Sequence, residues 1–145
     1  MLDERTGWRD EALSARHRTW GFHIPMFDVD FLCVEYSKRK PVALIEYKHE
    51  RGWLVSRGNA NMDVLISLGD NHTPALPVFT VQYSSNLDHY TIIAMNSVAE
   101  GLVRVQTVMN ELQYVEFLYV LRCSTMPPVI RDEICKRQDS RQRIL

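Results

Sequence analysis

Two short runs of the chain place charged side chains where a half-buried strand is otherwise expected. The first run, FDVDFLCVEY, carries Asp28 and Asp30, and the second, PVALIEYKHE, carries Glu46 and Lys48. Side chains alternate between the two faces of a strand, so each pair of charged residues shares one face of its run. If the two runs pair as a hairpin, one carboxylate from each converges on the same point.

Two carboxylates brought together in a half-buried site repel each other, and this costs free energy unless a cation lies between them. Mg²⁺ binds carboxylate oxygens, a backbone carbonyl and several waters. Lys48 would then lie beside the ion, where its ammonium orients a water or stabilises negative charge on a phosphate. The other interpretation is an edge hairpin with a solvated polar face, which is the commoner origin of such short patterns.

Hydrophobic periodicity and turn residues predict the elements that position these side chains. Asn59 or Asn61 caps one helix, which Gly69 ends, and Asn110 with Gln113 forms a capping box for a later one. The predicted helices cover 7–21, 59–68 and 110–122. The predicted strands cover 29–36, 42–49, a short run at 52–56, 76–84 and 89–96. This order predicts an α/β fold of the mixed α+β kind, with a central mixed β-sheet flanked by helices.

Length and composition predict a single domain over residues 1–145, with a core at about 8–96, a C-terminal helix at about 110–122 and a tail at 127–145. We expect the tail to be solvated or a frayed helix. The net charge of −1 gives no global field that attracts nucleic acid. Three widely spaced cysteines argue against a disulfide framework and indicate a reducing, cytoplasmic location. No apolar run is long enough for a membrane span.

The segments DFLC and ALIEYK resemble the motif of the PD-(D/E)xK nuclease superfamily, which has the restriction-endonuclease-like αβββαβ core. The resemblance covers about residues 8–96. It departs from the family pattern in one respect, because Pro25 lies five residues before Asp30 rather than next to it. The resemblance implies the following roles: Asp30 as the first metal-binding acid, with Asp28 as the other candidate, Glu46 as the second acid, Lys48 as the catalytic lysine, the Tyr47 carbonyl as a metal ligand, and Glu11 on the first helix near the metal.

The resemblance implies a metal-dependent DNA endonuclease that uses Mg²⁺ or Mn²⁺ to hydrolyse phosphodiester bonds. A lone domain of this kind suits a structure-selective or nicking enzyme, or a nuclease of a phage or mobile element. The alternative is a catalytically inactive module on the same fold that binds nucleic acid or protein. For DNA contacts we single out Arg16 and Arg18 near the metal site and Lys38 and Arg39 in the turn between the two runs, although all four also suit a solvated surface.

The segment from Glu111 to Arg122 is predicted to be apolar on more than one side. Leu112, Val115 and Tyr119 form one stripe, and further apolar residues lie elsewhere on the same helix. Such a helix needs more cover than its own sheet provides. We expect either a homodimer with this segment at the contact or a helix deep in the core of the domain.

Overall fold

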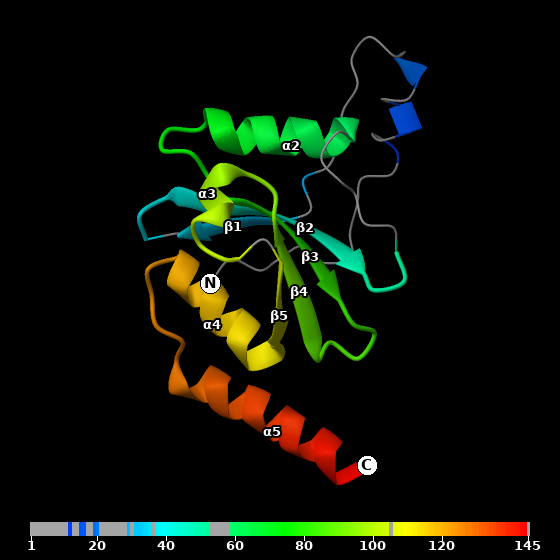
Figure 1. Cartoon of the computed structure of the whole chain (residues 1–145), viewed down its shortest axis with the longest axis vertical. Helices are drawn as coiled ribbons and strands as arrows, with labels where there is room; N and C mark the ends of the chain where they lie inside the picture. The colour runs from blue at the N-terminus through cyan, green and yellow to red at the C-terminus, as the bar shows by residue number, and fades with distance from the viewer. Residues whose placement is uncertain are drawn as a thin grey trace.

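The computed structural model describes residues 12, 15–16, 19–20, 29, 31–35, 37–52, 59–104 and 106–144. Five strands form one sheet in the order β1-β2-β3-β4-β5 (Figure 1). The strands are β1 (Phe31–Glu35), β2 (Lys40–His49), β3 (Val78–Tyr83), β4 (His89–Ala94) and β5 (Gln106–Asn110). β2 and β3 are parallel, and the other neighbours are antiparallel. The predicted mixed sheet flanked by helices is therefore confirmed.

Helices lie on both faces of the sheet (Figure 1). They are α2 (Ala60–Asn71), α3 (Ser97–Glu100), α4 (Glu111–Leu121) and α5 (Pro128–Ile144). α2 crosses from β2 to β3 over one face, α4 packs on the opposite face, and α5 lies beyond α4. None of the helices that the structure describes has the length and apolar character that a membrane span requires. The helix predicted at 7–21 and the short strand predicted at 52–56 fall mostly outside the described residues.

α2 packs closely on the sheet because of a glycine inside it. Met62 and Leu65 of α2 bury against Leu44 of β2 and Val78 of β3. A Cβ at Gly69 would lie 2.5 Å from Val78 Cγ2 and 2.8 Å from the Leu76 carbonyl oxygen. The prediction that Gly69 ends this helix is wrong, since α2 continues to Asn71. The glycine instead lets the helix backbone approach the start of β3.

The opposite face of the sheet packs on α4 through a second core cluster that includes Ile45, Phe79, Ile92 and Tyr114. The predicted capping box is confirmed, because Gln113 N donates to Asn110 Oδ1 at 2.8 Å and Asn110 N donates to Gln113 Oε1 at 2.9 Å. Asn110 is also the last residue of β5. The chain therefore turns from strand to helix without a linker.

Asn96 joins three elements with a single buried amide. Its Oδ1 accepts from the Val78 and Ala99 backbone N–H groups, each at 3.1 Å. Its Nδ2 donates to Asp70 Oδ1 at 2.9 Å and to the Leu76 carbonyl at 2.8 Å. The side chain thus ties the end of α2 and the start of β3 to α3, and every hydrogen-bonding position of the amide is used.

The segment predicted as a tail forms a continuous helix that is attached to the domain. Arg131 and Arg137 of α5 pair with Glu116 and Glu111 of α4, and Arg141 pairs with Asp88 in the turn between β3 and β4. Ile134 of α5 is 2 % exposed. α5 therefore covers part of α4 within the same chain. The homodimer contact that we expect at Glu111–Arg122 stays a prediction, and within the same chain α5 already lies against this segment.

Candidate functional site

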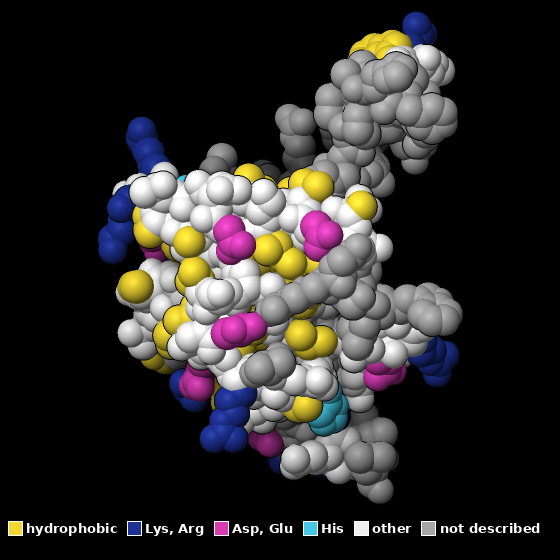
Figure 2. All heavy atoms as spheres, turned by 45° about the horizontal axis from the view of Figure 1, so that its top comes forward, with side chains coloured by type: hydrophobic (Ala, Val, Ile, Leu, Met, Phe, Trp, Pro, Cys, Tyr) yellow, Lys and Arg dark blue, Asp and Glu magenta, His cyan; other side chains and the backbone are white. Residues whose placement is uncertain are grey.

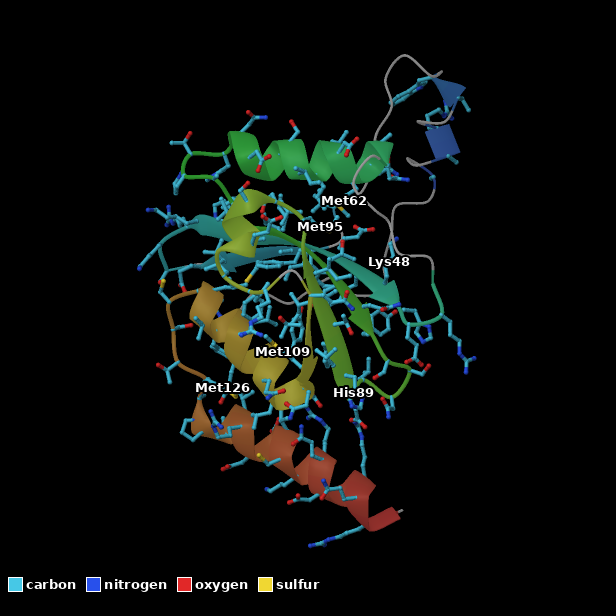
Figure 3. The ribbon with its side chains drawn as sticks, in the orientation of Figure 1. Lys48, Met62, His89, Met95, Met109 and Met126 are labelled. Carbon is cyan, nitrogen blue, oxygen red and sulfur yellow. The ribbon has the colours of Figure 1, made fainter. Side chains whose placement is uncertain are left out.

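Glu46 and Lys48 lie side by side on β2, on the face of the sheet that α2 covers. Leu44, two residues earlier, belongs to the α2 core cluster, and alternation puts Glu46 and Lys48 on the same face. The Lys48 Nζ lies 3.1 Å from Glu46 Oε1, and the two side chains are 29 % and 20 % exposed. Figure 3 shows Lys48 near the C-terminal end of β2, on the same side of the sheet as Met62. The predicted pair thus forms a half-buried ion pair.

Two residues of β3 extend this pair into what we call the polar strip, made up of Glu46, Lys48, Thr80 and Gln82. The parallel register sets Glu46 beside Thr80 and Lys48 beside Gln82. Gln82 Nε2 donates to the Glu50 carbonyl at 3.2 Å. Thr80 is 1 % exposed, and its hydroxyl has no hydrogen-bond partner among the described residues.

The Tyr47 carbonyl points toward the β1 side of β2. Leu44 N donates to the Pro77 carbonyl and Glu50 N donates to the Tyr83 carbonyl, so even-numbered residues of β2 direct their backbone groups toward β3. Tyr47 therefore directs its carbonyl toward the β1 side. The described pairing with β1 ends at Phe31 and Ile45, and the carbonyl lies just past this pair.

The described donors suit a hard divalent ion, although they do not complete a site. Glu46 offers a carboxylate and Tyr47 a carbonyl oxygen, which are the ligand types that Mg²⁺ and Mn²⁺ favour. Within the described part of the chain, no group of three or more His, Cys, Asp or Glu side chains is arranged to hold a metal ion. The other expected ligands, Asp30 and Glu11, lie outside the described residues, as does Asp28.

Three of the four predicted DNA-contacting residues, Arg16, Lys38 and Arg39, fall among the described residues. Lys38 and Arg39 are exposed in the turn between β1 and β2. From there β2 runs from Lys40 to Lys48, which at about 3.3 Å per residue is roughly 26 Å. The turn therefore lies at the opposite end of β2 from the ion pair. Arg16 is exposed, and Arg18 lies outside the described residues.

Charge is distributed unevenly over the α2 side of the molecule. Figure 2 turns the top of the molecule, where α2 lies, toward the viewer. Asp and Glu side chains lie among hydrophobic ones near the centre of this view, while Lys and Arg side chains lie mostly at its rim. On this face, contacts to a polyanion would therefore come mostly from the described Lys and Arg side chains at its rim.

His49 and Ser85 form a structural link beside the strip, not a catalytic pair. Arg51 N donates to His49 Nδ1 at 3.1 Å, so the proton of the neutral ring is on Nε2, which donates to Ser85 Oγ at 3.0 Å. Ser85 Oγ in turn donates to Glu50 Oε1 at 2.9 Å. Hydrogen bonds from Ser85 lower the pKa of Glu50. The imidazole has no acceptor left for a serine proton, and the chain of bonds joins the end of β2 to the β3–β4 turn.

A cluster of aromatic rings fixes β2 from the face opposite the polar strip. The Tyr47 and Tyr114 hydroxyls hydrogen-bond to each other, and Tyr90 stacks on Tyr114 with ring centroids 4.6 Å apart. The Phe31 ring packs edge-on against Tyr47. Burial raises the pKa of both Tyr47 and Tyr114, so the phenols stay neutral. Tyr47 thereby anchors the strand segment that carries Glu46 and Lys48.

We expect the stability of Tyr114→Phe to fall less steeply than that of the wild type as the pH rises in alkaline solution. The folded state holds the Tyr114 proton to higher pH than the unfolded chain, whose phenols titrate near pH 10. The stability due to this proton is complete below pH 10 and is lost as the pH rises further, because unfolding then releases the proton. Urea midpoints measured between pH 8 and 11 should therefore fall less steeply for the variant. Tyr119→Phe, whose ring contacts Arg122 instead, is the matched control. Equal slopes for wild type and Tyr114→Phe would contradict this explanation.

Thr80 is the residue of the strip whose role the sequence did not indicate. It lies in the run VFTVQY, where threonine fits a strand as well as valine does. Its position beside Glu46 depends on the parallel register between β2 and β3, the two strands that α2 connects. Only the polar character of one residue in an otherwise apolar run signalled it. Gln82 was visible as a polar residue, but its position beside Lys48 was not predictable from the sequence.

No protein-family model, curated protein or solved structure matches this chain. The function of the polar strip is therefore inferred from its residues, from the resemblance of its motif and from the sheet that carries it.

Proposed function

We propose that this protein is a nuclease of the PD-(D/E)xK superfamily that hydrolyses phosphodiester bonds of DNA with Mg²⁺ or Mn²⁺. The observation that carries the proposal is the Glu46–Lys48 ion pair on a half-buried face of β2. The arrangement around it supports the restriction-endonuclease-like core, because an antiparallel hairpin is followed by a helical crossover to a parallel strand. The proposed setting is cytoplasmic, with a phage or mobile element as the source.

Asp30 is the proposed first acid. The last described pair of the β1–β2 ladder is Phe31 with Ile45. Asp30 precedes Phe31 in the sequence and Glu46 follows Ile45. One further pair of an antiparallel ladder would set these two positions opposite each other with both side chains on one face. Glu11 is the proposed additional ligand from the N-terminal segment.

The proposed mechanism assigns a separate task to each residue. Asp30, Glu46 and the Tyr47 carbonyl would hold the divalent ion, which when bound polarises a phosphate oxygen and acidifies water. Lys48, positioned by its ion pair, orients the attacking water and stabilises negative charge on the phosphate. The water loses a proton to solvent as its oxygen forms a bond to phosphorus. The bond to the leaving sugar oxygen breaks in line with it, and this oxygen takes up a proton from solvent. Arg16 and Arg18 are proposed to bind the DNA backbone nearby.

The distance between the ion pair and the β1–β2 turn gives the proposal a spatial consequence. Lys38 and Arg39 would contact phosphates roughly 26 Å from the scissile one, which corresponds to about eight base pairs of duplex. Structure-selective or nicking cleavage suits one centre per chain, and a homodimer would supply a second centre for a paired cut. The phosphate contacts of the turn, the mode of cleavage and the homodimer all belong to the proposed function.

Incubation of the purified protein with supercoiled, linear and branched DNA tests the proposal. We expect cleavage with Mg²⁺ or Mn²⁺ and none with a chelator. DNA binding without cleavage under every condition would favour the inactive binding module instead. Absence of both cleavage and Mn²⁺ binding would refute the proposed function.

We expect Lys48→Ala to reduce turnover far more than DNA affinity. Loss of a group that stabilises the transition state costs on the order of a hundredfold in rate, whereas one phosphate contact contributes little to binding. Single-turnover cleavage and DNA binding in chelator measure the two effects separately. Lys136→Ala, an exposed lysine of α5, serves as the control. A parallel fall in affinity and rate would show that Lys48 only binds DNA.

A further inference from the structure

The Thr80 hydroxyl differs from the other buried polar atoms that lack a hydrogen-bond partner in the described structure. The four others belong to Asp88, Glu111, Arg122 and Arg141, and each of these side chains takes part in an ion pair. Thr80 has no such compensation and is 1 % exposed. A buried hydroxyl without a partner costs free energy of desolvation, and valine of nearly the same shape would avoid this cost. A threonine at this position therefore needs an explanation.

The surroundings of Thr80 leave few polar groups that its hydroxyl can reach. On one side its register partner is Ile93 of β4, and on the other side it is Glu46 of β2. Met62 and Leu65 of α2 belong to the apolar cluster on this face. Adjacent strands lie about 4.8 Å apart, and Glu46 is the charged residue in register with Thr80 across the sheet.

We propose that Thr80 is a positioning residue: its hydroxyl donates a hydrogen bond to a water that also binds the Glu46 carboxylate. This inference rests on the proposed function, in which Glu46 is a metal ligand. A water between the two side chains would have polar partners on both, as stably buried waters require. Its effect would be to hold the carboxylate, already paired with Lys48 at 3.1 Å, in one orientation toward the ion.

This role can be tested without an activity assay. Binding of Mn²⁺ alone to the protein is measured from the decrease in the signal of the free ion. We expect Thr80→Val to weaken Mn²⁺ affinity by roughly ten- to hundredfold, as loss of an outer partner of a metal ligand does, and Thr80→Ser to stay within about threefold of wild type. Thr107→Val on β5, which makes the same change at a half-buried strand threonine, is the control and should bind as wild type. Wild-type affinity in Thr80→Val would overturn the inference.

A second measurement in chelator separates this inference from the proposed function. Thr80→Val is made in the wild type and in Glu46→Ala, and thermal unfolding midpoints are compared. If a shared water couples the side chains, the shift caused by Thr80→Val should differ between the two backgrounds by at least about 2 °C. Equal shifts would overturn the link to Glu46. Coupling without any Mn²⁺ binding by the wild type would keep the Thr80–Glu46 link and refute the metal site.

Discussion

Glu46→Gln is expected to abolish metal-dependent DNA cleavage while the protein stays folded. The substitution keeps the shape of the side chain but removes the charge that would bind the ion. Stabilisation of the transition state by a bound metal ion is worth several kcal/mol, so the cleavage rate should fall at least about a hundredfold. Because the Glu46 and Lys48 side chains are 20 % and 29 % exposed, loss of their ion pair should change stability by only about 1 kcal/mol. Cleavage of plasmid DNA over a range of Mg²⁺ concentrations measures the effect.

The control for Glu46→Gln is Glu133→Gln, an exposed acid on α5. It should cleave like the wild type, which would show that loss of one negative charge is not itself harmful. Circular dichroism should give the same spectrum for both variants. Cleavage by Glu46→Gln at the wild-type rate would show that the active site is elsewhere.

Asn96→Ala is expected to lower the free energy of unfolding by about 4 kcal/mol. The amide makes four hydrogen bonds, and its removal leaves the buried Val78 and Ala99 N–H groups without their acceptor. Net contributions of about 1 kcal/mol per bond, together with the cost of the unsatisfied groups, give this magnitude. Urea denaturation monitored by fluorescence provides the measurement.

Asn96→Asp refines the test of this network. Aspartate keeps the acceptor for the two N–H groups but loses the donor and faces the Asp70 carboxylate, so it should also destabilise at neutral pH. Asn71→Ala, an exposed residue at the end of α2 that contacts Ser67 of the same helix, should change stability by no more than about 0.5 kcal/mol. A loss below about 1 kcal/mol for Asn96→Ala would mean that water replaces the amide.

Local sequence signals were enough to predict most of the sheet and two helix starts. β2, β3 and β4 are apolar runs bounded by turn residues, and Asn59 and Asn110 are caps whose side chains accept backbone N–H groups. β5 was not predicted, because its five residues alternate between exposed and half-buried and run directly into the capping box. The stability of such an edge strand comes from its pairing with β4, which a local pattern does not show.

The candidate site was predictable only where it depends on one strand. The two-residue period of β2 forces Glu46 and Lys48 onto one face, and this follows from spacing alone. Thr80 joins them through the parallel register between β2 and β3, which the packing of α2 sets. α5 likewise depends on tertiary contacts, because ion pairs with α4 and with the β3–β4 turn hold a segment that has few apolar residues.

The order of strands in the sheet has a consequence for how the chain folds during synthesis. Each described strand pairs with the one that precedes it along the chain, so no later strand has to insert between two that have already paired. As the nascent chain leaves the ribosome, β2 finds β1 already available, and β3, β4 and β5 each add to the growing edge. Among the described strands, the longest connection is the crossover through α2 from β2 to β3. Mostly local pairing of this kind favours rapid folding and shortens the time for which an incomplete sheet edge is exposed to other chains.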